Sequence, residues 1–287
     1  MTSTTITSPR HVPAIDRGPE DHALKARHRA MWALGDYPAV ASEIIAALGP
    51  ALAEAAAIGP GQLVLDVAAG SGNVALPAAL RGARVTSSDL TPELLRAGRA
   101  EAEAAGLDIA WEPADAEALP YADAQFDVVT SCVGVMFAPH HQAAADELVR
   151  VCRPGGTVAL IAWTPAGFIG QLFATMKPYA PPPPAGVQPP PLWGDPAHVR
   201  ALFGDRVDIV RAETRDLIVT HFADGAAFRD YFKANYGPTI AAYRGIAGDP
   251  ERVAALDRAL AELGDRFSTV PGSMPWEYLL VVGRRSA

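Results

Sequence analysis

The sequence predicts an α/β protein in which a mostly parallel sheet is covered by helices on both faces. From about residue 59, short apolar runs alternate with amphipathic stretches whose apolar residues recur at helical spacing. Glycine or a capping residue marks many of the boundaries between them. Because neighbouring parallel strands need a crossover, usually a helix, this alternation is typical of a parallel sheet.

Helices and strands are predicted along the first half of the chain as follows. Residues 20–58 have helical spacing with two breaks, and we expect several short helices there. The helix expected over residues 91–106 is the best marked, since Thr91 can cap it, Pro92 suits its first turn and Gly106 ends it. The other helices are expected at 73–81 and 139–152, and the strands at 63–68, 83–89, 108–115, 126–133 and 156–163.

The regular alternation of strand and helix patterns ends after Trp163. A helix is expected near residues 167–180, and a proline-rich segment, 181–196, favours a stiff, extended connection. A strand at 207–219 and a last strand at 275–285 flank helical residues. The predicted division is a flexible tail (1–19), an N-terminal helical lid (20–58), a core (59–165), a proline-rich connection with its helix (166–205), and a late strand pair (206–287) with a helical insertion (224–268).

Composition and charge limit the kinds of partner and binding site that we expect. The formal charge of −8 comes from scattered acids, and without a basic run we expect no nucleic-acid partner. The two cysteines have no metal-ligand spacing, so we expect neither a metal site nor a disulfide framework. The polar N-terminus does not resemble a signal peptide, and no apolar run reaches membrane-spanning length, so we expect a cytoplasmic protein that does not enter a membrane. The oligomeric state is left open.

A glycine turn follows the first strand of the core. Gly70, Gly72 and Ala75 satisfy the permissive G-x-G-x-x-G/A dinucleotide pattern, and Asp89 stands where such sites place an acid for a ribose. A nicotinamide-dependent oxidoreductase is therefore one alternative. Asp66 counts against it, because a carboxylate beside the turn suits a cationic amino acid better than a pyrophosphate. An acid after the third strand, Asp115, can accept a hydrogen bond from an adenine amino group.

Over about residues 60–165 the sequence resembles the class I S-adenosylmethionine-dependent methyltransferases, particularly the ubiquinone and menaquinone biosynthesis group. The resemblance rests on "VLDVAAGSGN", "SSDLTPELL", "ADAEALPYADAQFDVV", "HHQAAADELVRVCRPGG" and "VALIAW", in the order and at the spacing of that family. It implies a Rossmann-like seven-stranded sheet, S-adenosylmethionine as cofactor and S-adenosylhomocysteine as product. The cofactor-binding residues that it implies are Asp66, Ala68, Gly70 and Gly72 for the methionine part, Asp89 and Leu90 for the ribose and adenine, Asp115 and Ala116 for the adenine edge, and Cys132 and Val133 beside the sulfonium.

The sequence carries fewer signals for the residues that act on the methyl acceptor. Methyl transfer is an in-line displacement that depends on alignment and exclusion of water, and a base can help when the acceptor carries a proton. His141 or His140 is the first choice for that base, with His28 and His221 as alternatives, although histidines at a helix start are often only capping or solvated.

We expect a small, apolar or aromatic acceptor. The side chains predicted for its pocket are Met136, Phe137, Trp163, Trp193, Tyr231 and Tyr236. In the resembling family the N-terminal helices cover the cofactor, and Trp32 and Tyr37 are the natural contacts here. A third alternative is a catalytically silent binding protein that keeps the cofactor fold.

Overall fold

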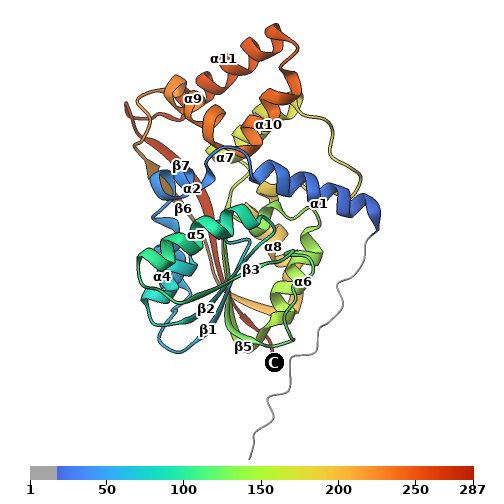
Figure 1. Cartoon of the computed structure of the whole chain (residues 1–287), viewed down its shortest axis with the longest axis vertical. Helices are drawn as coiled ribbons and strands as arrows, with labels where there is room; N and C mark the ends of the chain where they lie inside the picture. Colours follow the sequence, from blue (N-terminus) through green and yellow to red (C-terminus); the bar gives the residue numbers. More distant parts are fainter. Residues whose placement is uncertain (1–17) are drawn as a thin grey trace, which may run out of the picture.

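The computed structural model describes residues 18–287, which form one seven-stranded sheet with helices on both faces (Figure 1). Of the predicted tail, 1–19, residues 1–17 lie outside the described residues. The strand order is β3-β2-β1-β4-β5-β7-β6, and β7 runs antiparallel to both of its neighbours. The strands are β1 (Leu63–Val67), β2 (Arg84–Asp89), β3 (Ile109–Pro113), β4 (Phe126–Cys132), β5 (Cys152–Trp163), β6 (Val207–Val219) and β7 (Met274–Arg285). The predicted α/β, mostly parallel sheet is confirmed.

Helices cover the sheet as the alternation predicts, with α4 and α5 on one side and α6 and α8 on the other (Figure 1). The helices are α1 (Pro19–Trp32), α2 (Tyr37–Ala39), α3 (Leu48–Ala55), α4 (Ala75–Leu80), α5 (Pro92–Ala104), α6 (His141–Val151), α7 (Phe168–Met176), α8 (Pro196–Phe203), α9 (Gly225–Asn235), α10 (Gly237–Ile246) and α11 (Pro250–Phe267). A π-helical segment, Val40–Ile44, follows α2 directly.

The start of α5 shows how a local prediction and the structure differ. Thr91 occupies the N-cap position, as expected, but its side chain makes no capping hydrogen bond. Instead, the Thr91 backbone N–H donates to Asp89 Oδ1 over 2.8 Å. The carboxylate at the end of β2 thus holds the turn into α5, which ties the first residues of this helix to the carboxyl edge of the sheet.

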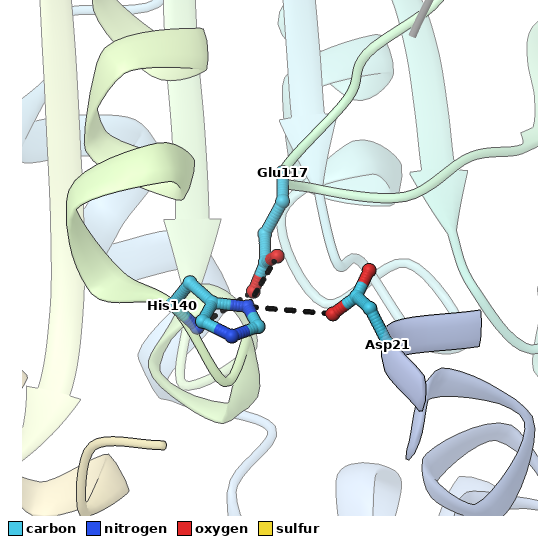
Figure 2. Close-up of side chains that lie close together, drawn as sticks. All are labelled: Asp21, Glu117 and His140. Atoms are coloured by element: carbon cyan, nitrogen blue, oxygen red, sulfur yellow. Dashed lines mark hydrogen bonds and ion pairs between the residues drawn. The ribbon is translucent and has the colours of Figure 1, made fainter. Parts of the chain in front are cut away.

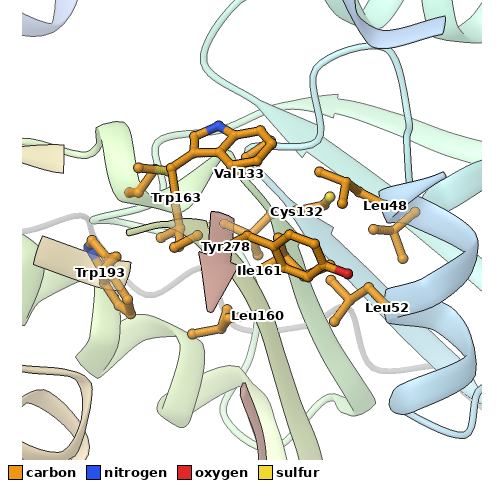
Figure 3. Close-up of a cluster of buried hydrophobic side chains, with 14 of the residues drawn as sticks. Leu48, Leu52, Cys132, Val133, Leu160, Ile161, Trp163, Trp193 and Tyr278 are labelled. Carbon is orange, nitrogen blue, oxygen red and sulfur yellow. The ribbon is translucent and has the colours of Figure 1, made fainter. Parts of the chain in front are cut away.

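The segment predicted as a lid, 20–58, divides into two parts with different surroundings. Leu48 and Leu52 of α3 are buried and join the cluster around β4 and β5 that includes Cys132 and Ile161 (Figure 3). Helix α3 is therefore part of the core of the sheet domain, because its apolar face is buried against strands. Helix α1 lies instead at the carboxyl edge of the sheet, where it contacts the loops that follow the strands.

The helical insertion between β6 and β7 consists of α9, α10 and α11, which gather with α7 beyond one end of the sheet (Figure 1). An aromatic cluster joins it to the sheet. Phe228 of α9 lies 4.8 Å from Phe168 of α7 and 6.5 Å from Trp276 of β7, measured between ring centroids. Such edge-to-face pairs add to the burial of apolar area. Aromatic packing thus helps to hold the insertion on the domain.

Among residues 18–287, no single helix is long and apolar enough to cross a membrane, while one bent pair, Tyr37–Ile44 with Leu48–Ala55, meets the criteria of length and composition.

We predict that Phe228→Ala destabilises the protein by about 3–5 kcal/mol, since it removes a fully buried ring at the centre of this contact. Urea unfolding followed by circular dichroism measures the change. Val210→Ala is the control, because Val210 is 59% exposed on β6 and its truncation should shift the free energy of unfolding by less than about 0.5 kcal/mol. Equal effects of the two substitutions would contradict the assigned contact.

Candidate functional site

The loop after β1 turns sharply at the carboxyl edge of the sheet. Ala68, Gly70 and Gly72 all have positive φ, at 51°, 59° and 96°. Gly72 is needed for packing, since a Cβ there would lie 2.7 Å from the Trp111 ring. Gly70 is needed for space above the loop, since a Cβ there would lie 3.3 Å from the Tyr37 ring. Ala68 adopts its left-handed conformation without being glycine, and such strain is concentrated at functional sites.

Asp89, at the end of β2, holds this loop in place. Its Oδ2 accepts a hydrogen bond from the Gly70 N–H over 2.9 Å, while Oδ1 accepts the one from Thr91. The side chain is buried, and burial raises the pKa of its carboxyl, against the two backbone N–H groups that lower it. Each carboxylate oxygen keeps a second lone pair, so Asp89 can still accept hydrogen bonds from a ligand.

Asp66 lies behind the loop. It is 1% exposed, its Oδ2 accepts from the Ala75 N–H over 3.0 Å, and Thr130 Oγ1 donates to its Oδ1 over 3.2 Å. Burial raises its pKa to about 7. Asp66 therefore supports the start of α4.

The opposite wall follows β4. Val133 has φ 47°, which is rare for a β-branched residue, and its N–H donates to Ile161 O over 2.8 Å. The next residue must be glycine, because a Cβ on Gly134 would lie 2.0 Å from Ala68 O. The strained positions after β1 and β4 thus pack against each other. Burial raises the pKa of the Cys132 thiol in this wall, so the thiol stays protonated at neutral pH.

Between these walls lies a cleft at the carboxyl edge of the sheet. Eight of the ten residues predicted for the cofactor line it, and Asp66 and Gly72 do not. The eight are Ala68, Gly70, Asp89, Leu90, Asp115, Ala116, Cys132 and Val133, and the cleft is completed by Lys25, His28, Trp32, Tyr37, Ala69, Asn73, Thr91, Leu94, Ala114, Gly134, Phe137, Ala138 and Pro139.

A second, smaller space, which we call the inner cavity, adjoins the cleft. Tyr37, Val133 and Phe137 line both spaces. The remaining lining residues are apolar or aromatic: Val40, Ile45, Trp163, Ile169, Phe232, Tyr236 and Trp276. They come from the N-terminal segment, the sheet, α7 and the helical insertion, which are far apart in the sequence.

Charged side chains join α1 to the rim of the cleft (Figure 2). Lys25 Nζ lies 2.6 Å from Asp115 Oδ2, 2.9 Å from Glu117 Oε2 and 3.0 Å from Asp21 Oδ2. Burial would lower the pKa of Lys25, but its hydrogen bonds to these carboxylates and the charge of Asp115 raise it above its ordinary value, so it stays charged. His140 Nδ1 lies 2.9 Å from Glu117 Oε2. The ion pairs of Lys25 with Asp115 and Glu117 fix α1 above the cleft.

Asp21, Glu117 and His140 also carry the donor types of a metal site, with ligand atoms within 4.8 Å of one another. The Lys25 ammonium contacts both of the carboxylates in this set. It therefore supplies the positive charge that balances them.

The two histidines predicted as bases do not line the cleft or the inner cavity. His140 is held by Glu117, and His141 is fully buried with its Nδ1 3.0 Å from His198 Nε2. Burial, followed by the neighbouring histidines, lowers the pKa of His141 to about 4, so it is neutral at pH 7. The geometry does not favour either residue as the base. Of the other two histidines considered, His28 lines the cleft, whereas His221 lines neither space.

The residues predicted for the acceptor pocket divide equally. Phe137, Trp163 and Tyr236 line the inner cavity. The others, Met136, Trp193 and Tyr231, do not: the first two are buried elsewhere in the core, and Tyr231 donates its hydroxyl to Glu43 Oε2 over 2.8 Å.

Sequence reasoning missed Lys25, Ile169 and Trp276 among the residues of the two spaces. An apolar residue in a helix or strand has the same pattern in a packed core as beside a cavity, so the sequence held no signal for the last two. Trp32 and Tyr37, expected as contacts of the N-terminal segment, do line the cleft.

Comparisons with known proteins agree with this geometry. Residues 65–160 match a methyltransferase domain family. An uncharacterised protein of Mycobacterium tuberculosis is 54% identical over 93% of this chain and 97% of its own length. A demethylmenaquinone methyltransferase of Thermus thermophilus is 39% identical over 36% of this chain and 47% of its own.

The fold has solved counterparts. The crystal structure of the YcgJ protein of Bacillus subtilis superimposes with a TM-score of 0.57 at 18% identity, covering 82% of this chain and 96% of that one. The carboxyl-edge cleft, the matched domain and the shared fold support one assignment: residues 65–160 form a methyltransferase domain of the class I S-adenosylmethionine-dependent type, which implies S-adenosylmethionine as the cofactor.

Proposed function

We propose that this protein transfers a methyl group from S-adenosylmethionine to a small apolar or aromatic metabolite bound in the inner cavity. The observation that carries the proposal is the wall that the two spaces share. Tyr37, Val133 and Phe137 line both the cleft and the inner cavity, so a molecule in one lies next to a molecule in the other. A nicotinamide-dependent oxidoreductase, which the glycine pattern left open, is not the family to which the chain belongs.

The residues of the cleft fit the cofactor. Gly70 lines the cleft and has no side chain, so its backbone is open to close approach by the methionine part. Asp89 offers buried carboxylate oxygens for the ribose hydroxyls, and Asp115 an oxygen at the rim for the adenine amino group. We infer that Ala68, Leu90, Ala116, Cys132 and Val133 complete the contact through the backbone and apolar surface.

When bound, S-adenosylmethionine supplies a methyl group that leaves a sulfonium sulfur as the lone pair of the acceptor attacks the methyl carbon, giving S-adenosylhomocysteine. The residues of the chain act by positioning. The strained backbone at Ala68 and Val133 fixes the two walls, and the rings of Tyr37 and Phe137 limit how an acceptor can enter. Helix α1 excludes water from the same side.

The chemistry of the inner cavity also limits the acceptor. Its lining contains no histidine, carboxylate or lysine. Its titratable groups are two tyrosines, Tyr37 and Tyr236, whose pKa values burial raises, so their hydroxyls stay protonated at neutral pH. We infer that the acceptor atom attacks without a histidine base, and that alignment provides most of the rate enhancement.

The direct test is transfer of radiolabelled methyl from S-adenosylmethionine to a panel of small phenols, thiols and amines with apolar skeletons. Transfer to one class would support the proposal and identify the acceptor atom. Normal binding of S-adenosylhomocysteine with no transfer to any of these compounds would favour the catalytically silent alternative.

We predict that Asp89→Asn raises the Kd for S-adenosylhomocysteine about 10- to 100-fold, since the charge and one acceptor oxygen are lost and hydrogen bonds to charged groups contribute about 1.5–3 kcal/mol. Isothermal titration calorimetry measures it. The control is Asp108→Asn, at an exposed acid that precedes β3 at the far edge of the sheet, and it should leave the Kd unchanged. An unchanged Kd in Asp89→Asn, with the fold intact, would contradict the assigned ribose contact.

We predict that Ile169→Trp abolishes methyl transfer while S-adenosylhomocysteine still binds, because Ile169 lines the inner cavity but not the cleft and the larger ring fills the cavity. The matched control is Ala174→Trp, which adds the same ring at an exposed position of the same helix. Turnover that survives in Ile169→Trp would mean that the acceptor binds elsewhere.

We predict that Lys25→Met speeds the release of S-adenosylhomocysteine about tenfold, because the three carboxylates lose their counter-charge and α1 separates from the rim. Tenfold is about 1.4 kcal/mol, well within the cost of breaking a buried ion pair. Stopped-flow fluorescence follows the release, and Lys177→Met, at an exposed lysine, is the control. Slower release would contradict closure by α1 and would mean that Lys25 competes with adenine for Asp115.

A further inference from the structure

Trp276 is a buried hydrogen-bond donor at the inner cavity. It lies on β7, is 1% exposed and lines the inner cavity but not the cofactor cleft. Its Nε1 is buried and has no hydrogen-bond partner among the described residues. A buried tryptophan usually finds a partner for this N–H, and a buried donor without one costs about 1–3 kcal/mol.

The ring is held firmly. Phe168 stacks on it with centroids 5.1 Å apart and an interplanar angle of 18°, and Trp163 and Phe232 meet it edge to face at 5.9 and 5.7 Å. With aromatic neighbours on several sides, the indole has little room to turn. The N–H is therefore fixed before any ligand binds, which lowers the entropic cost of using it for recognition.

Another tryptophan shows that the position of the donor matters as well as its burial. Trp193 is also 1% exposed with an unpartnered Nε1, but it lines neither space and packs against His141 and Phe203. Trp276 combines the unpartnered donor with a cavity wall. That combination points to a ligand, since small-molecule sites are mostly apolar and carry a few placed polar groups.

We propose that Trp276 is a substrate-binding residue whose Nε1–H donates a hydrogen bond to an oxygen of the methyl acceptor, away from the atom that is methylated. This inference rests on the proposed function. The acceptor is then a small, flat, largely apolar molecule with one carbonyl, ether or phenol oxygen.

The test uses two probes with one skeleton, α-tetralone, which carries a ketone, and tetralin, which does not. Their Kd values are measured by calorimetry on the full chain saturated with S-adenosylhomocysteine. The quantity of interest is the ratio of the tetralin Kd to the tetralone Kd. We expect Trp276→Phe, which removes the N–H and keeps an aromatic ring, to lower this ratio at least about fivefold, as for the loss of one hydrogen bond.

The matched control is Trp193→Phe, which removes the other unpartnered indole donor and should leave the ratio as in the natural protein. A second measurement does not depend on how well a variant folds. In the natural protein labelled with ¹⁵N-tryptophan, which has five indole signals, tetralone should shift one indole N–H signal downfield and tetralin should not.

Two results would overturn the inference: an equal ratio in Trp276→Phe and the natural protein, or no binding of either probe while S-adenosylhomocysteine binds normally. Failure of S-adenosylhomocysteine itself to bind would instead overturn the proposed function, and this inference with it.

Discussion

The site depends on one hydrogen bond between two neighbouring strand ends. The Gly70 N–H donates to Asp89 Oδ2, which joins the turn after β1 to the end of β2. Because Asp89 also accepts from Thr91, a single carboxylate fixes both the glycine turn and the start of α5. Gly70 and Asp89 both line the cleft, and Ala68, which also lines it, adopts a left-handed backbone in the same turn.

The inner cavity, which we propose as the acceptor site, is built from other segments. Its walls come from α7, the insertion and β7, and aromatic packing around Trp276 holds them together. A shared sheet edge for the cofactor and a variable set of helices for the acceptor would let one core serve many substrates. The ion pairs of Lys25 add the N-terminal helix as a third wall, so the site is assembled from segments at both ends of the described chain.

Most of the cofactor cleft could be predicted because its residues lie at strand ends, and hydrophobic pattern locates strands well. Asp89, Asp115 and Val133 were placed in this way, and all three line the cleft. Asp66 could not be resolved, since an acid at a strand end can face the cleft or hold the next helix, and here it accepts from Ala75. His141 was expected to lie beside the methyl site, but it lines neither the cleft nor the inner cavity. Its ring is buried beside His198 instead.

The sequence by itself determined the alternating fold, the glycine turn and the acids that follow the strands, because each is set by local periodicity and by conformations that few residues adopt. Only the tertiary structure decided which aromatic side chains face a cavity. Trp193 and Trp276 are equally buried, and each carries an unpartnered N–H. They differ in that packing between distant segments places Trp276 at the wall of the inner cavity, whereas Trp193 lines neither the cleft nor the inner cavity. Long-range packing of this kind has no periodicity that a sequence can display.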